Sequence, residues 1–88
     1  ESYNFYSVLK PEQDIDIDSK FVEFYHKRNE KTEVIVLINH TDFYRETNVF
    51  SRSPVSFRNL RSNEKLAYSV EFNLKLRPSE VVFLEVQR

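Results

Sequence analysis

Residues 66–76 carry an apolar side chain at every second position, and this alternation constrains the fold more than any other part of the chain. The apolar set is Leu66, Tyr68, Val70, Phe72, Leu74 and Leu76. A period of two places alternate side chains on one side of a β-strand, whereas a helix would scatter the same residues around its circumference. The sequence therefore predicts a strand over residues 66–76, with one face in a hydrophobic core.

A turn and a closing strand follow this stretch. Residues 77–80 read Arg-Pro-Ser-Glu, and the proline has no N–H for a β-ladder, so Pro78 ends the strand and fixes φ for a turn. Residues 81–86 are rich in β-branched side chains, and as far as Leu84 both faces of an extended strand would be apolar. This composition predicts a well-covered final strand.

Further strands are expected along the whole chain. The expected strands span residues 3–9, 14–18, 20–27, 34–38, 43–50 and 55–57. Polar residues 28–31 should connect the strands at 20–27 and 34–38 as a β-hairpin. The strand at 34–38 should be the most buried strand of the protein. Residues 51–54, which end in proline, are expected to break the chain between two strands. The prediction is one all-β domain over residues 1–88, an antiparallel β-sandwich of about seven to eight strands.

The chain contains no glycine, so another residue type must occupy left-handed turn positions. Asparagine tolerates that backbone region better than other residues that carry a Cβ. The predicted left-handed positions are Asn29, Asn39, Asn48 and Asn63.

Charge and cysteine content exclude several classes of function. The formal net charge is −1, which gives no strong field to attract nucleic acid or an anionic membrane. Because cysteine is absent, there is no disulfide, thiolate nucleophile or cysteine-based metal site. No apolar run approaches the ~20 residues of a membrane span. Since the chain starts at Glu1 and has no methionine, we expect it to be a fragment or a processed piece of a longer chain.

Asp14, Asp16 and Asp18 alternate with two isoleucines, so an extended backbone places three carboxylates on one face. The favoured interpretation is a solvated face beside a half-buried strand. Clustered carboxylate oxygens also suit calcium, although the glycine and distal glutamate of an EF-hand are missing. A third interpretation is that these charges discourage edge-to-edge strand pairing.

No catalytic constellation emerges from the residue types and their spacing. The two histidines, His26 and His40, fall at opposite ends of the predicted hairpin, so a zinc site that also uses Asp42 is disfavoured. No serine lies in a nucleophile-elbow pattern, and there is no glycine-rich phosphate loop. Three glutamates fall on predicted solvent faces, namely Glu23, Glu71 and Glu85. We therefore predict no catalytic residue, no cofactor and no metal ligand.

Eight phenylalanines and five tyrosines raise the alternative of a binding module, because sugar rings and nucleobases both stack on aromatic faces. The candidate residues for ligand or domain contact are Tyr6, Tyr44, Arg45 and Phe50. Four arginines between positions 45 and 61 resemble a nucleic-acid stripe, but the balanced charge argues against it. Most phenylalanines alternate into predicted core faces, and no tryptophan is present. Carbohydrate binding therefore stays an alternative beside a purely structural role.

Two motifs resemble a known kind of domain. Residues 34–42, VIVLINHTD, are similar to an apolar strand followed by asparagine and a small polar turn in the C-terminal β-sandwich domains of barrel-type glycoside hydrolases. Residues 74–85, LKLRPSEVVFLE, resemble the Leu-x-Leu-x-Pro-x-Glu-Val-x-x-Leu-Glu pattern that closes those domains. Asn63 stands in the preceding turn, where glycine is usual in the family.

The resemblance implies an accessory role, with residues 1–88 as the C-terminal fragment of a larger chain. In that family the domain packs against the barrel, which carries the catalytic glutamates, so no catalytic residue transfers to this chain. β-Xylosidases of glycoside hydrolase family thirty-nine have this arrangement, and a similar one ends some long bacterial AraC-type transcription regulators, which would place the chain in the cytoplasm. The expected partner is an upstream barrel domain of the same chain, with no direct nucleic acid contact and no membrane. An autonomous module that binds carbohydrate weakly through exposed Tyr and Phe is the alternative.

Overall fold

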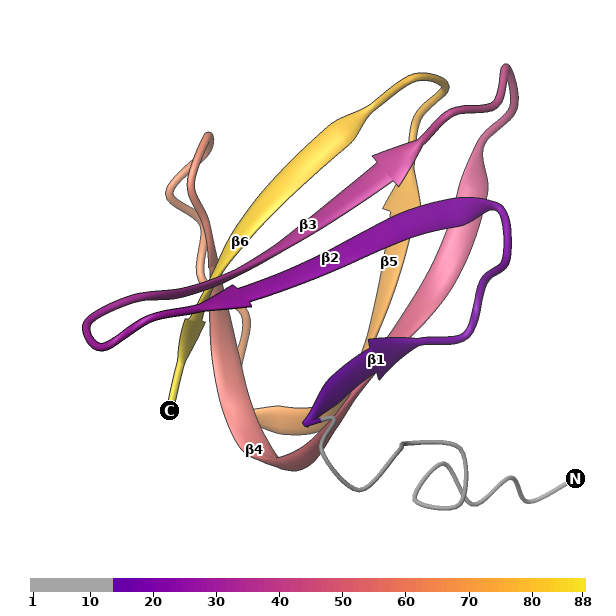
Figure 1. The fold of residues 1–88 in the computed structure, drawn as a ribbon. Coiled ribbons are helices and arrows are strands. Elements are labelled where there is room, and N and C mark those ends of the chain that lie inside the picture. Colours follow the sequence, from indigo (N-terminus) through magenta and orange to yellow (C-terminus); the bar gives the residue numbers. More distant parts are fainter. Residues whose placement is uncertain (1–13) are drawn as a thin grey trace, which may run out of the picture.

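The computed structural model describes residues 14–88, whose regular structure is entirely β (Figure 1). The strands are β1 (Ile15–Ile17), β2 (Val22–Arg28), β3 (Glu33–Asn39), β4 (Arg45–Asn59), β5 (Ser69–Leu76) and β6 (Val81–Gln87). No helix capable of crossing a membrane occurs in this part of the chain. The strand predicted at residues 3–9 lies outside the described residues.

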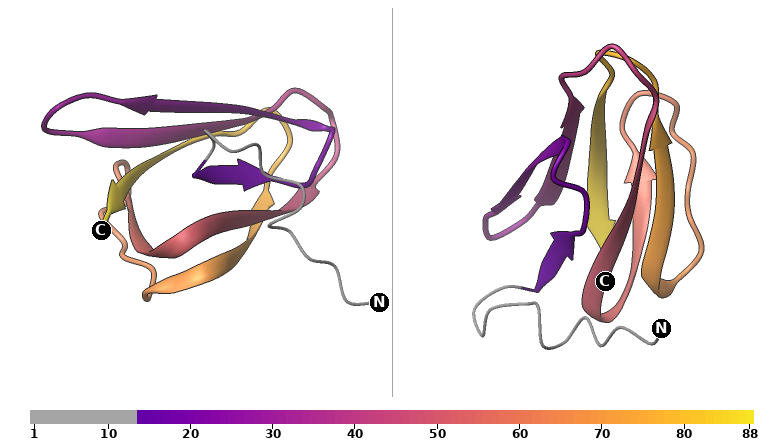
Figure 2. Two further views of the ribbon diagram at one scale, coloured as in Figure 1. Left: turned by 60° about the horizontal axis from the view of Figure 1, so that its bottom comes forward. Right: turned by 90° about the vertical axis from the view of Figure 1, so that its right-hand side faces the viewer.

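All strand pairs are antiparallel and belong to one six-stranded sheet, with the order β1-β4-β6-β3-β2 and with β5 on β4. The sheet curls until it is nearly closed into a barrel, so that β2, β3 and β6 face β1, β5 and the first part of β4 (Figure 2). The structure confirms the all-β antiparallel class. The sandwich of seven to eight strands is not confirmed, because residues 14–88 form a single curled sheet.

The curl depends on β4, which at 15 residues is the longest strand of the described chain. From Arg45 to Ser51 this strand pairs with β5, with β1 or with both, it pairs with β5 again at Val55, and from Ser56 it pairs with β6. The register shifts between Phe50 and Val55, and Pro54 lies in this irregular segment, where no ladder N–H is needed. The predicted break at residues 51–54 is therefore wrong. These residues bend one strand instead of separating two.

The core fills the space between the two halves of the sheet. Its buried apolar side chains are Ile15, Val22, Ile35, Leu37, Val49, Val55, Phe57, Phe72, Leu76, Leu84 and Val86. The rings of Phe57 and Phe72 meet edge to face, with centroids 4.7 Å apart. No residue of β3 is exposed, in line with the deep burial predicted for that arm.

The alternation at residues 66–76 correctly predicted four of six core residues, whereas Val70 is half-buried and lies outside the core cluster. Phe72 and Leu76 are buried, and Leu66 and Leu74 pack against the core. Tyr68 is 61% exposed, contrary to expectation. The strand β5 begins only at Ser69, which pairs with Val55 of β4. Tyr68 precedes the strand, so the alternation of inward and outward side chains does not extend to it.

Two residues with a Cβ adopt positive φ in the described chain, Asn63 at 66° and Ser79 at 60°. The prediction for Asn63 is confirmed, and those for Asn29, Asn39 and Asn48 are wrong. The Asn29 side chain supports its turn differently, because its Oδ1 accepts hydrogen bonds from the N–H groups of Lys31 and Thr32. Ser79 was not anticipated.

Candidate functional site

Asn39, at the end of β3, ties together two turns at one end of the barrel. Its side chain is fully buried, and its Nδ2 lies 2.8 Å from the carbonyl oxygen of Phe43 and 2.9 Å from that of Arg77. Its Oδ1 accepts hydrogen bonds from the N–H and the hydroxyl of Thr41, at 3.0 and 2.7 Å. Both amide hydrogens and the oxygen are thus used inside the protein, which fixes the β3–β4 loop against the β5–β6 turn.

The β5–β6 turn has a defined geometry. Pro78 is followed by Ser79 at positive φ, the pattern of a type II turn. The N–H of Glu80 donates to the carbonyl of Arg77 at 3.1 Å, and the N–H of Arg77 donates to Oε1 of Glu80 at 2.7 Å. The N–H of Ser79 donates to the carbonyl of Thr41, which links this turn to the neighbouring loop a second time.

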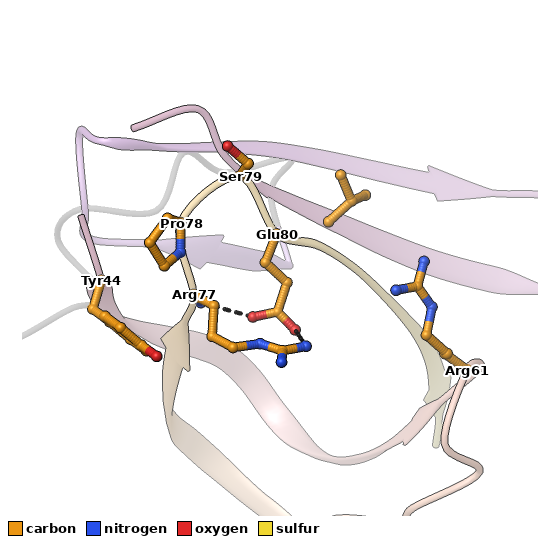
Figure 3. A pocket seen from close by; sticks show the side chains of 7 residues that line it. Tyr44, Arg61, Arg77, Pro78, Ser79 and Glu80 are labelled. Atoms are coloured by element: carbon orange, nitrogen blue, oxygen red, sulfur yellow. Dashed lines mark hydrogen bonds and ion pairs between the residues drawn. The ribbon is translucent and has the colours of Figure 1, made fainter. Parts of the chain in front are cut away.

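An open hollow of about 550 Å³ lies beside these turns (Figure 3). It is lined by Tyr44, Arg61, Arg77, Pro78, Ser79, Glu80 and Val81. Tyr44 is 62% exposed, and the carboxylate of Glu80 forms an ion pair of 3.6 Å with Arg77. Arg61 comes from the loop after β4 and faces the hollow from the side opposite Tyr44. The hollow therefore combines an aromatic ring, two guanidinium groups and one carboxylate.

The sequence prediction found one residue of this hollow. Tyr44 lines it, but Arg45 lies elsewhere, with its guanidinium 4.0 Å from the ring centroid of Phe21 and its Nε bonded to the hydroxyl of Thr41. Phe50 is half-buried within β4, and Tyr6 lies outside the described residues. The residues missed are Arg61, Arg77 and Glu80. Residues 77–80 were recognised as a turn, but nothing in the sequence places that turn beside Tyr44.

A second feature is the outward face of β2, β3 and β6. Its cross-strand rows are Glu23, Ile38 and Val81, then Tyr25, Val36 and Phe83, then Lys27, Val34 and Glu85. We call the six apolar members of these rows, namely Tyr25, Val34, Val36, Ile38, Val81 and Phe83, the outer apolar face. Tyr25 is 43% exposed and Phe83 42%. Val81 belongs to both features, so the outer apolar face adjoins the hollow.

Charged residues border the outer apolar face. The carboxylate of Glu23 forms hydrogen bonds with the hydroxyl of Tyr25 and with His40. Both bonds lower the pKa of Glu23, and the bond from Tyr25 has the larger effect. Arg58 donates to Oε1 of Glu85 from both Nε, at 3.1 Å, and a terminal nitrogen, at 2.6 Å. The face is thus an apolar centre with a rim of paired charges, the usual composition of a protein interface.

At the opposite end of the barrel, Glu33 is buried among basic groups. Its carboxylate accepts two hydrogen bonds of 2.8 Å from Arg88 and lies 2.6 Å from Nε2 of His26. The hydrogen bonds from Arg88, helped by the one from His26, lower the pKa of Glu33 to about 2 against the effect of burial. Arg88 also pairs with Asp14 at 2.6 Å. This network ties the last residue to β3 and to the segment before β1.

The remaining candidates for chemistry are dispersed. His26 lies opposite Ile35 in the β2–β3 register, while His40 follows the far end of β3, so the predicted separation of the two histidines is confirmed. Asp14 pairs with Arg88, and Asp18 bonds to the backbone and side chain of Asn48. Burial acts to raise the pKa of Asp18, but the hydrogen bonds from Asn48 and Thr47 outweigh it and lower the pKa. Residues 14–88 contain no group of three His, Cys, Asp or Glu side chains able to hold a metal ion.

Comparisons with known proteins address the fold. No protein-family profile and no curated protein matches the chain. The solved structures that match in fold include Gan42B, a GH42 β-galactosidase from G. stearothermophilus, and a catalytic mutant of the same enzyme. Each has a TM-score of 0.58 and 18% sequence identity, and each match covers 96% of this chain and 11% of that chain. Neither is a family thirty-nine enzyme or an AraC-type regulator. The comparisons therefore support a fold that occurs within a glycoside hydrolase, and they do not support the expected relation to family thirty-nine or to AraC-type regulators.

Proposed function

We propose that this chain is a non-catalytic accessory β-domain, which packs through its outer apolar face against a barrel domain of a larger, glycoside-hydrolase-like protein. The observation that carries the proposal is the outward side of β3. Val34, Val36 and Ile38 occupy its three outward positions, where a sheet with one solvated face normally carries polar residues. A strand that is apolar on both parities is typical of a sheet covered on both faces.

The neighbouring strands extend this apolar surface. Phe83 lies directly opposite Val36 on β6, and Tyr25 lies opposite Val36 on β2, so three apolar side chains form one continuous row. Each Å² of apolar surface that is removed from water contributes about 25 cal/mol of favourable free energy. Covering this row would stabilise an interface, and the paired charges at its rim would stay hydrated.

The size relationship supports a barrel-bearing partner. The fold shared with this chain occupies 11% of a β-galactosidase chain, so a unit of this size occurs within a much larger glycoside hydrolase. We propose a family thirty-nine β-xylosidase or an AraC-type regulator with a similar barrel as the host of this domain. In either host we assign the general acid and the nucleophile to the barrel, and only a packing role to this domain.

Hydroxyl-radical footprinting tests the docking proposal. Tyr25 and Phe83 should be oxidised readily in the 88-residue chain and protected in the natural polypeptide that contains it. Tyr68 is a matched control, because it is exposed and lies outside the outer apolar face. Equal oxidation of Tyr25 and Phe83 in both proteins, or a natural polypeptide with no barrel domain, would overturn the proposal.

A charge on the face gives a second test. Val36→Lys in the natural polypeptide should separate the two domains, so that two unfolding transitions replace one. Lys75→Glu changes a charge on β5, away from the face, and should leave a single transition. A single transition in Val36→Lys would count against docking at this surface.

A further inference from the structure

We propose that the hollow beside Asn39 binds an acidic saccharide, a sugar that carries one carboxylate, with Tyr44 under the sugar ring and Arg61 at the carboxylate. This ligand class follows from the groups that line the hollow and does not depend on the docking proposal. The volume of about 550 Å³ lies in the usual range of small-molecule sites and is large enough for one or two sugar units.

Tyr44 provides the stacking surface. Its ring is 62% exposed and borders the hollow, although a large aromatic side chain gains free energy when it is covered. The less polar face of a sugar ring can cover an aromatic ring while its hydroxyls stay hydrated. A flat aromatic border on a polar hollow therefore favours a saccharide over a purely apolar ligand.

Arg61 determines the charge preference. Its backbone N–H bonds to the side chain of Asn59, but its guanidinium makes no ion pair with any residue between 14 and 88. Arg77, by contrast, is already balanced by Glu80 at 3.6 Å. The hollow thus has one uncompensated positive charge, and a guanidinium binds a carboxylate with two parallel hydrogen bonds.

Glu80 selects for hydroxyl donors. Its carboxylate borders the hollow and is acceptor-only when ionised, with about four lone-pair sites in all. Its partners among residues 14–88 are the N–H and the guanidinium of Arg77, so acceptor sites remain for sugar hydroxyls. The same negative charge disfavours a phosphate dianion. A ligand with one carboxylate and several hydroxyls suits this combination better than a nucleotide.

The lining groups are held in place before any ligand arrives. Asn39 fixes the carbonyls of Phe43 and Arg77, and these residues directly flank Tyr44 and the 78–80 segment. The backbone bond from Ser79 to Thr41 adds a second link between the same two loops. A preorganised site loses less conformational entropy on binding, which favours affinity even in an open hollow.

The test is an NMR titration of the 88-residue chain with galacturonic acid, galactose and acetate in parallel. The acid sugar should shift resonances of Tyr44, Arg61 and Glu80, with a Kd of about 1 mM. Galactose should bind more weakly, because it lacks the carboxylate, and acetate should bind more weakly, because it lacks the ring.

Variants separate the two contacts. Arg61→Gln should weaken galacturonic acid binding about two- to fivefold and leave galactose binding unchanged, since an exposed ion pair contributes no more than this. Lys31→Gln removes the same charge at the far hairpin and should have no effect. Tyr44→Leu should weaken both sugars.

Three results would overturn the proposal. The first is equal affinity for the acid and neutral sugars, and the second is equal affinity for acetate and the acid sugar, which would mark a simple anion site. The third is an absence of shifts at these residues with all three ligands. None of these results bears on the outer apolar face, so the docking proposal is tested separately.

Discussion

The side-chain amide of Asn39 donates a hydrogen bond of 2.9 Å to the backbone carbonyl of Arg77, 38 positions later in the chain. This bond joins the end of β3 to the turn between β5 and β6, and so fixes two walls of the hollow. An asparagine does this well, because one side chain supplies two donors and one acceptor to backbone groups that have no ladder partner.

Replacing Asn39 should therefore destabilise the whole domain. Asn39→Ala removes the hydrogen bonds that this fully buried amide makes to Thr41, Phe43 and Arg77, and we expect a loss of about 3 kcal/mol in the free energy of unfolding. Urea denaturation followed by circular dichroism measures this loss. Asn73→Ala removes an exposed hydrogen bond to Asn48 and should cost less than about 1 kcal/mol. Similar losses in both variants would contradict the central role of Asn39.

Stability should fall in acid because of Glu33. The pKa of Glu33 is about 2 in the folded protein, below the ordinary value of 4.5 that applies in the unfolded chain. A lowered folded pKa gives stability that is present above pH 4.5 and is lost as the pH falls toward 2. The loss from this group should be about 3 kcal/mol, measured as urea unfolding at pH 7 and pH 2.5.

Glu33→Gln provides the control for this pH dependence. The variant should be less stable than the unsubstituted 88-residue chain at pH 7, because Arg88 and His26 lose their charged partner. It should also lose less stability on acidification. The exposed Glu64→Gln should keep the full pH dependence, and an unchanged acid response in Glu33→Gln would assign the effect to other groups.

Ser79 should respond to substitution through its backbone alone. At a φ of 60°, a residue with a Cβ is strained by about 1 kcal/mol, so Ser79→Gly should raise the free energy of unfolding by up to about 1 kcal/mol. Ser79→Val should lower it by about 1–2 kcal/mol, because a β-branched residue resists this region more strongly. Thermal unfolding of both variants gives the comparison, and a less stable Ser79→Gly would show that the turn is not strained.

The two sides of β3 should differ in their sensitivity to truncation. Leu37 is fully buried between the halves of the sheet, and Leu37→Ala should cost about 3 kcal/mol through the lost contacts and the cavity. Val36 is half-buried on the outer apolar face, and Val36→Ala should cost about 1 kcal/mol in the 88-residue chain. Urea denaturation of both variants tests this difference, and equal costs would mean that the outward side is already covered.

The sequence was most informative where a local pattern and a tertiary requirement coincide. The period-two alternation of residues 66–76 predicted the buried Phe72 and Leu76, and the absence of glycine pointed to the left-handed Asn63. It failed at Ser79, because Pro78 predicts a turn without deciding its type. Ser79, the residue after the proline, takes positive φ here. The Glu80–Arg77 backbone bond lies within the turn, but the bond from the Ser79 N–H to the Thr41 carbonyl joins it to a distant segment of the chain.

By itself, then, the sequence determined the strand class, the β2–β3 hairpin with its separated histidines, and the inward parity of most core residues, since these follow from local alternation and turn chemistry. Only the tertiary structure decided that residues 51–54 bend a strand, because β5 and β1 hold β4 before the bend and β6 holds it afterwards. The same closure brought Arg61 and Glu80 beside Tyr44 and left the apolar outer side of β3 half-buried within residues 14–88. These relationships join segments far apart in the chain, so no short-range pattern encodes them.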